Sequence, residues 1–424
     1  MMHPATGKDL QTKVEVIIVA NFASTDGTGN CRFGELARRL ADMGAEVELL
    51  TSDFEHDNHT RRRDPIRPDD YKLTLLHEPG YRKNISLKRL VSQQVFAKSV
   101  EKYLDSRQSA PDLVYCATPS PAAARVCAQY SQRHGNAFVV DVQDLWPDAF
   151  GMSFRMPRAI NVLFQPMIRS SRIAYRQADL VVGVSGTYVA HAEHTADQDL
   201  NTLVVFLGCS VAAGDHVAAE SVIDKTRERI RIVYAGTLSH SYDLPMVIDA
   251  MASLSEHDAR FSELVFVVLG DGPKRQEFEH YARHSGVNVQ FLGKLPYSDM
   301  LWELRSADIA VNPIVAGSMG SVLNKAGDYG AAGLPVINTQ ESPEYRDLLD
   351  RYESGRNCAS GSTSDVADAI RELVDNPDLR SQMGRNGRCM AEDLFDRDKT
   401  YDALVRNLLA LTPGNVQAKS TESK

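Results

Sequence analysis

Two successive series of apolar runs, separated by helical stretches, constrain the fold of this chain more than any other feature. Runs that are apolar throughout are typical of strands buried on both faces of a parallel sheet. Their alternation with helices predicts an α/β fold with two doubly wound, Rossmann-like domains facing each other. The first series lies at 14–20, 45–51, 112–117, 137–142, 178–185 and 202–206, and the second at 230–236, 264–272, 287–293, 308–313 and 334–339.

The length of 424 residues also favours two domains, because single cores stop growing at roughly 250–300 residues. Between the two series, residues 208–230 are small and polar and contain no clear strand, so we place the junction there. The expected domains are 1–206 and 207–395. The polar tail 412–424 is expected to be disordered.

The net charge is concentrated in the second half. Residues 1–206 hold 24 basic and 24 acidic side chains, whereas the remainder holds 23 and 32 and carries the whole net charge of −9. This balance argues against a nucleic-acid partner, whose binding surface would be basic. The neutral half has two basic stretches without an acid, 79–100 and 151–176. The second is also apolar, which suits either an anionic membrane surface or an amphipathic helix with a solvated arginine face.

The sequence shows no targeting signal, and its metal-binding candidates are weak. Residues 1–13 lack the apolar core of a signal peptide, and no run reaches the roughly 18 apolar residues of a membrane span. The six cysteines form no C-x-x-C pair, which argues against disulfides or a zinc site. We therefore expect a cytoplasmic protein without a metal.

Three strand ends in the second domain could hold an anionic ligand, because helix N-termini beyond such ends offer free N–H groups. The first is Gly236-Thr237, in a loop that also carries His240, and the second holds Gly270 and Gly272. The third is the stretch "SVLNKAGDYGAAGLPVINT" at 321–339.

In that stretch Ser321, Lys325 and Asp328 are spaced to share one face of a helix. A lysine in the first turns opposes the helix dipole, and a bound diphosphate would reverse this cost. Asp328 suits the vicinal hydroxyls of a sugar. The alternative is a surface ion pair beside a solvated loop.

The first domain offers weaker candidates. Asp144 ends an apolar run and precedes Trp146, so it could position an acceptor, act as a base or cap a helix. Gly29 belongs to the stretch "TDGTGN" at 25–30. A dinucleotide fingerprint would need a third glycine at position 32, which is Arg32, so a plain turn is equally expected.

The segments "AGTLSHSYDL", "VVLGDGP", "VQFLGKLPYSDM" and "NKAGDYGAAGLPVI", in this order, resemble the sugar-nucleotide domain of family 4 retaining glycosyltransferases, which have the GT-B fold. "DVQDLWPD" resembles the subset that builds bacterial capsule, exopolysaccharide or O-antigen chains. The resemblance covers nearly the whole chain. It implies that the terminal helix, at about 396–411, returns to the first domain.

The resemblance assigns donor-binding roles along the second domain. Lys325 would bind the diphosphate, and Asp328 matches the second acid of the family's Glu-x7-Glu motif, which contacts the ribose. The first acid of that motif falls at Gly320, so the carboxylate that contacts the sugar is absent or replaced. The remaining donor-binding candidates are Gly29, Gly236, Thr237, His240, Gly270, Gly272, Lys294, Leu295, Ser321, Val322 and Asn324.

The implied reaction moves a sugar, with retention, from a nucleoside diphosphate to a hydroxyl of a glycan or lipid-linked acceptor, with a UDP-sugar as the expected donor. Lys325 and Asp144 are the catalytic candidates, and neither a metal nor a cofactor is required. The protein would work in the cytoplasm, at the inner face of the plasma membrane if the basic stretch docks there. A sugar-nucleotide 2-epimerase of related fold and a non-catalytic partner subunit are the alternatives.

Overall fold

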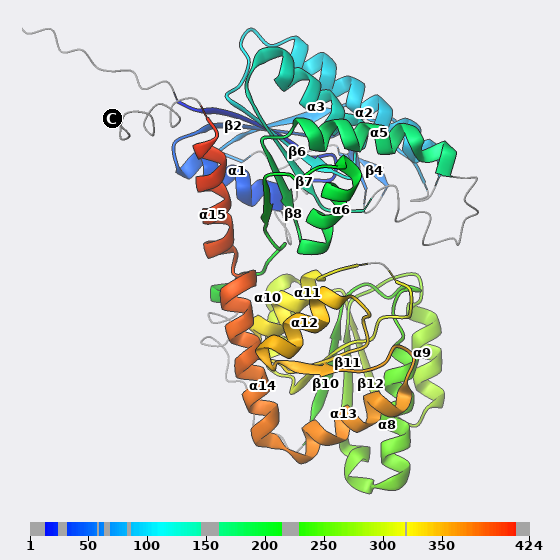
Figure 1. The fold of residues 1–424 in the computed structure, drawn as a ribbon. Helices are drawn as coiled ribbons and strands as arrows, with labels where there is room; N and C mark the ends of the chain where they lie inside the picture. Colours follow the sequence, from blue (N-terminus) through cyan, green and yellow to red (C-terminus); the bar gives the residue numbers. More distant parts are fainter. Residues whose placement is uncertain are drawn as a thin grey trace, which may run out of the picture.

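The computed structural model describes residues 13–23, 32–56, 59–62, 68–82, 86–145, 161–213, 229–318 and 320–412. Within these residues the chain forms two α/β lobes stacked end to end (Figure 1). Each lobe is built on one parallel sheet, of seven strands in the first and six in the second. The predicted fold class, two Rossmann-like halves, is therefore confirmed. The limits 1–206 and 207–395 stay a prediction, since part of the junction lies outside the described residues.

The first sheet has the strand order β5-β2-β1-β6-β7-β8-β9, and all its pairs are parallel. Six of these strands coincide with the apolar runs. β5 was not predicted, because its alternating sequence KLTLL is only partly buried at the edge. The strands are β1 (Glu15–Val19), β2 (Glu46–Ser52), β5 (Lys72–Leu76), β6 (Leu113–Thr118), β7 (Ala137–Val142), β8 (Leu180–Gly183) and β9 (Thr202–Val204), with a separate hairpin of β3 (Phe54–Glu55) and β4 (Thr60–Arg61).

Helices cover both faces of this sheet. One face packs against α2, α3, α5 and α6 through a cluster that includes Phe96 and Tyr175. The other packs against α1 and α15 through Phe33, Leu40 and Tyr401. The bounds are α1 (Arg32–Asp42), α2 (Leu87–Asp105), α3 (Pro121–His134), α5 (Asn161–Gln177), α6 (Gly186–Ala196) and α15 (Arg397–Ala410).

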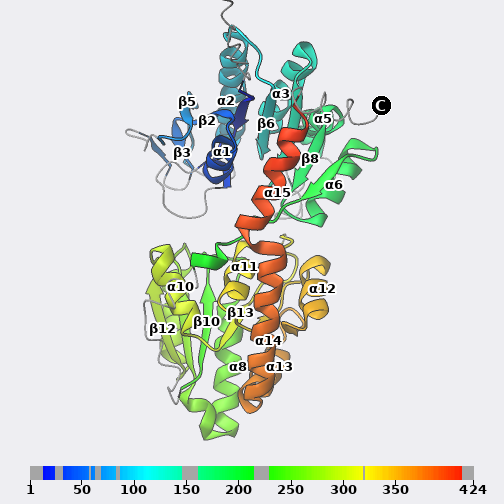
Figure 2. The ribbon, with the colours of Figure 1, turned by 90° about the vertical axis from the view of Figure 1, so that its left-hand side faces the viewer.

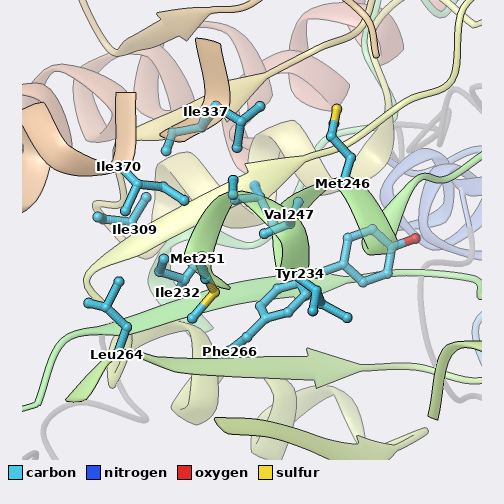
Figure 3. Packing of buried hydrophobic residues seen from close by; sticks show 14 of the residues in the cluster. Ile232, Tyr234, Met246, Val247, Met251, Leu264, Phe266, Ile309, Ile337 and Ile370 are labelled. Atoms are coloured by element: carbon cyan, nitrogen blue, oxygen red, sulfur yellow. The ribbon is translucent and has the colours of Figure 1, made fainter. Parts of the chain in front are cut away.

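The second sheet has the order β12-β11-β10-β13-β14-β15, again entirely parallel. Its last strand, GRN, contains no apolar residue and was not predicted. Figure 3 shows the core on one face, where Met251 of α8 lies against Ile232 and Phe266 of the sheet. The strands are β10 (Arg231–Ala235), β11 (Val265–Leu269), β12 (Asn288–Gly293), β13 (Ile309–Asn312), β14 (Val336–Asn338) and β15 (Gly355–Asn357).

The helices of the second lobe also divide between two faces. α8, α9 and α13 contribute to the core of Figure 3, and α10, α11, α12 and the π-helical turn η3 contribute to the core on the opposite face. The bounds are α8 (Leu244–His257), η2 (Ala259–Glu263), α9 (Arg275–His284), α10 (Tyr297–Arg305), α11 (Asn324–Ala331), α12 (Pro343–Tyr352), α13 (Thr363–Asp375), α14 (Pro377–Met390) and η3 (Ala391–Phe395).

The chain crosses between the lobes twice, and the two crossings lie side by side. Cys209 N donates to Phe395 O at 2.7 Å, and Arg397 N donates to Cys209 O at 3.1 Å. Beyond this point α15 leaves the second lobe and packs on α1 of the first (Figure 2). α15, which follows the second lobe in the chain, thus completes the core of the first lobe.

Candidate functional site

The carboxyl ends of β10 and β11 form a tightly packed glycine turn. A Cβ on Gly270 would lie 1.9 Å from the carbonyl oxygen of Gly236, and a Cβ on Gly272 would lie 2.3 Å from that of Leu238. Any larger residue would therefore push back the loop that follows β10. The two glycines fix the shape of this loop, and Gly236 remains at its surface.

Lys325 lies against this turn with its amine inside the lobe. Its Nζ would be 2.9 Å from a Cβ on Gly236, and the side chain is buried. Nζ sits over the rings of Tyr234 and Tyr242, 4.2 and 4.1 Å from their centroids. It has no hydrogen-bond partner among the described residues. Within the part of the chain that the structure describes, the amine contacts the faces of two aromatic rings, an arrangement that attracts cations.

Burial also shifts the pKa of this lysine. Desolvation lowers the pKa of Lys325 well below its ordinary value of 10.5. A buried amine whose N–H groups bond no other described residue is suited to donate hydrogen bonds to an anionic ligand. Tyr234 and Tyr242 were missed by sequence reasoning, although both stand within a few residues of Gly236.

Asp328 faces a different group of residues. Its Oδ1 accepts a hydrogen bond of 2.8 Å from Tyr297. Burial raises the pKa of Asp328 to about 6, while the Tyr297 hydrogen bond and the charge of Arg397 oppose the rise. Asp328 therefore lies between α10 and the crossing segment that carries Arg397.

The prediction that Ser321 shares a helix face with Lys325 and Asp328 is wrong. The helix begins at Asn324, with Leu323 as its N-cap, so Ser321 belongs to the preceding loop. The Gln340 amide donates to the carbonyls of Gly320 and Ser321, at 2.7 and 2.8 Å, and holds that loop in place.

A carboxylate that sequence reasoning missed connects the two lobes. Glu344, in the first turn of α12, accepts hydrogen bonds from the backbone N–H groups of Gly186 and Thr187, at 2.7 and 2.9 Å, and from the Thr187 hydroxyl at 2.7 Å. Ser321 Oγ donates to the same carboxylate at 2.5 Å. Burial opposes ionisation of Glu344, but these hydrogen bonds outweigh it and lower its pKa. We call Glu344, Gly186, Thr187 and Ser321 together the interlobe latch.

Asp144 lies near the latch on the first lobe. It follows β7, is half-buried, and its Oδ1 accepts from Leu145 N at 2.8 Å. Burial, with the charges of Asp144 and Glu344, raises the pKa of Tyr188 to about 12. Tyr188 is therefore near both carboxylates, which puts Asp144 on the side of the first lobe that faces the second.

The other predicted donor residues differ in exposure. Leu295 and Val322 are half-buried against the core of the second lobe, and Gly29 lies outside the described residues. The described residues contain no group of three or more side chains arranged to hold a metal ion. Four of the predicted residues are exposed at or near the carboxyl edge of the sheet: Thr237, His240, Lys294 and Asn324.

The basic stretch 151–176 is described only from residue 161. There α5 packs on α3, and two of its arginines bond the end of α6, Arg172 to Thr195 O at 2.9 Å and Arg176 to Ala196 O at 2.6 Å. None of the described helices is both long and apolar enough to cross a bilayer.

Two family models match the chain, one in each lobe. Residues 27–200 match "Glycosyl transferase 4-like domain" and residues 219–390 match "Glycosyl transferases group 1". Among curated relatives, glycogen synthase of Mycobacterium tuberculosis is 26% identical over 188 residues, 44% of either chain. O-antigen chain mannosyltransferase C of Escherichia coli is 23% identical over 233 residues, 54% of this chain and 59% of that one. The alignments thus span about half the length of these relatives.

The solved structures include one with the same two-lobed architecture. Anabaena Alr3699/HepE, in complex with UDP, superimposes with a TM-score of 0.66 at 15% identity and covers 94% of this chain and all of that one. At this identity the likeness concerns the fold. With its two family matches and its two Rossmann-like lobes, this chain belongs to the family 4 glycosyltransferases of the GT-B fold.

Proposed function

We propose that this glycosyltransferase transfers a sugar, with retention of configuration, from a UDP-sugar to a hydroxyl of a glycan or lipid-linked acceptor in bacterial surface polysaccharide synthesis. The buried amine of Lys325, without a hydrogen-bond partner among the described residues and turned toward the Gly236 loop, carries the proposal. The UDP named with Alr3699/HepE and the O-antigen chain named with the Escherichia coli relative support the choice of donor and pathway.

Retaining transfer needs stabilisation of the departing diphosphate more than it needs a strong nucleophile. Lys325 would supply a cation, and the N-terminus of α11, next to it in sequence, would add oriented N–H dipoles. The Lys325 amine is preorganised in a water-poor environment, where electrostatic stabilisation is strongest. The leaving phosphate would take the proton of the acceptor hydroxyl. Asp328 would accept hydrogen bonds from the ribose hydroxyls.

The acceptor side of the reaction belongs to the first lobe in this proposal. Asp144 would orient the acceptor hydroxyl from the carboxyl edge of the first sheet. The interlobe latch would keep the lobes together around the donor and so limit hydrolysis, the competing reaction. No step of this mechanism requires a metal or a cofactor.

Donor turnover with Lys325→Ala tests the proposal. UDP-, GDP- and dTDP-sugars are incubated without acceptor, and slow hydrolysis to the nucleoside diphosphate is followed by chromatography. We expect one UDP-sugar to be hydrolysed by the wild type, and Lys325→Ala to lower kcat/KM by roughly 100-fold, in the range of losses for one stabilising group in the transition state. Lys102→Ala, which removes an exposed lysine from α2, is the matched control.

The same screen separates the alternatives. Epimerised UDP-sugar in the absence of acceptor would identify a 2-epimerase. Nucleotide binding without turnover of any donor would identify a non-catalytic subunit. Full activity in Lys325→Ala would remove the lysine from the mechanism.

We also propose that the arginine-rich stretch 151–176 docks on anionic lipid. The protein should then float with vesicles containing phosphatidylglycerol and lose this association at about 1 M salt, where the Debye length falls to about 3 Å. Flotation that ignores salt, or none at all, would contradict membrane docking.

A further inference from the structure

A basic cavity lies at the edge of the second sheet opposite to Lys325. It has a volume of about 440 Å³, within the range of small-molecule sites, and lies between the end of α10, the turn from α11 to β14, and α14. Asp308 and Pro335 in its wall precede β13 and β14, whereas Gly236 follows β10. Because these strands are parallel, the cavity and the donor candidates are at opposite ends of the sheet.

Four arginines and one carboxylate line this cavity. The arginines are Arg305, Arg380, Arg385 and Arg388, and the carboxylate, Asp308, accepts a hydrogen bond of 2.9 Å from Arg231 N. Residues 207–424 hold 23 basic and 32 acidic side chains, so chance would not favour this excess of cations.

Capping of α11 accounts for two of the four arginines. Arg305 and Arg388 donate to the carbonyl of Ala331 at the end of α11, at 3.5 and 3.1 Å, where the helix dipole attracts cations. Arg388 also pairs with Glu392 at 2.6 Å. These contacts give both side chains a structural role.

Arg380 and Arg385 do not cap α11, and Arg380 instead caps the end of α13 through Leu373. Arg380 donates to Leu373 O at 2.6 Å, and Arg385 donates to the side chains of Ser381 and Gln382, at 2.8 and 2.5 Å. Within the described residues neither has a carboxylate partner. A guanidinium carries five N–H donors, so these bonds leave most of them for a ligand.

Backbone without side chains forms part of the wall between these arginines. A Cβ on Gly384 would lie 2.2 Å from the carbonyl oxygen of Gly333, so α14 approaches the α11–β14 turn as closely as glycine allows. Pro335 and Pro377 stiffen the same wall. The cavity is therefore a formed feature of the packing of α14.

We propose that this cavity binds a phosphate group at a site separate from the donor site, with Arg380 and Arg385 as its main ligands. The planar guanidinium matches the geometry of phosphate oxygens and pairs with them in a bidentate manner. A sugar phosphate would fill the volume, and the headgroup of an anionic lipid would offer the same chemistry.

Isothermal titration calorimetry of the full chain tests the site, with inorganic phosphate and glucose 6-phosphate as probes. The titrations use the Lys325→Ala background, so that the donor site does not contribute. We expect saturable binding that weakens at least tenfold in Arg380→Ser/Arg385→Ser. The control Arg351→Ser/Arg371→Ser, which removes two exposed arginines elsewhere on the lobe, should bind like its parent. If the double variant fails to fold, Arg385→Ser alone, at an exposed position, repeats the test.

Vesicle sedimentation distinguishes the source of the phosphate. Binding to phosphatidylglycerol but not phosphatidylcholine vesicles that depends on Arg380 and Arg385, without binding of either soluble probe, would assign the site to a lipid headgroup. Binding of the soluble probes would assign it to a free phosphate ester. The proposal is overturned if probe binding survives in Arg380→Ser/Arg385→Ser, or if neither probe binds and vesicle binding, to which residues 151–176 would also contribute, is the same in this variant as in its parent.

Discussion

At the scale of single residues, burial shifts the pKa values of Lys325 and Asp328 in α11 in opposite directions. Desolvation lowers the pKa of the Lys325 amine and raises that of the Asp328 carboxyl to about 6. The charged form of each is disfavoured in the absence of a ligand. A donor diphosphate would favour protonation of Lys325, and ribose hydroxyls would favour ionisation of Asp328.

We therefore predict a bell-shaped pH dependence of kcat/KM for the donor. Below pH about 6 Asp328 becomes protonated and loses its strength as an acceptor, so activity falls toward acid. Toward alkali, Lys325 loses its proton at a pH below its ordinary 10.5, and activity falls again. Asp328→Asn should remove the acid limb and leave the alkaline one. Initial rates between pH 4.5 and 10.5 measure both; a profile that keeps its acid limb in Asp328→Asn would contradict the assignment.

At the scale of elements, α11 is short and unusually close to its neighbours. A Cβ on Gly330 would lie 2.6 Å from the carbonyl oxygen of Gly387 in α14, and one on Gly327 would lie 3.2 Å from Cβ of Phe395. Gly333, at φ 71°, ends the helix in the left-handed conformation. The glycines that make α11 a poor helix in isolation allow it to pack against α14 and η3.

Gly330→Ala should therefore destabilise the second lobe. The new methyl meets backbone, which cannot rotate away, and overpacking of this kind costs about 1–3 kcal/mol, more than the roughly 1 kcal/mol that alanine gains in a helix. Gly327→Ala meets a side chain at a longer distance and should cost less. Urea unfolding followed by circular dichroism compares the two variants; equal stability of Gly330→Ala and wild type would show that α14 moves freely.

At the scale of the whole molecule, two contacts join the lobes at separate places. One is the paired crossing at Cys209 and Phe395, and the other is the interlobe latch formed by Glu344 with Gly186, Thr187 and Ser321. The first is covalently continuous with both lobes and suits a hinge. The second consists of side-chain hydrogen bonds that can open and close.

Glu344→Ala should let the lobes separate. Hydrogen bonds to a charged group contribute roughly 1.5–3 kcal/mol each when buried, and this half-buried carboxylate accepts four. We expect a larger radius of gyration in small-angle X-ray scattering and roughly tenfold lower kcat/KM. Glu341→Ala, near the same helix, is the control. Identical scattering from Glu344→Ala and wild type would mean that the latch does not hold the lobes.

The sequence predicted the elements whose signal is local and missed the contacts made across the fold. Buried parallel strands are continuous apolar runs, so most were found, while β5 and β15 at sheet edges lack that signal. Ser321 was wrongly placed because helical spacing was extended through a loop. The partners of Lys325 and Glu344 could not be predicted from local patterns. Tyr234 lies on β10, far from Lys325 in sequence, and Gly186 lies 158 residues away from Glu344 in the other lobe.

The position of α15 also bears on how the protein is made. Tyr401, Leu404, Val405 and Leu408 belong to the core beneath α1, yet they follow the entire second lobe in the chain. During synthesis that apolar face of the first lobe stays uncovered while the ribosome makes the second lobe. At about 5–20 residues per second this delay lasts on the order of ten seconds or more. Until α15 has been made, this face is an exposed apolar patch on the nascent chain.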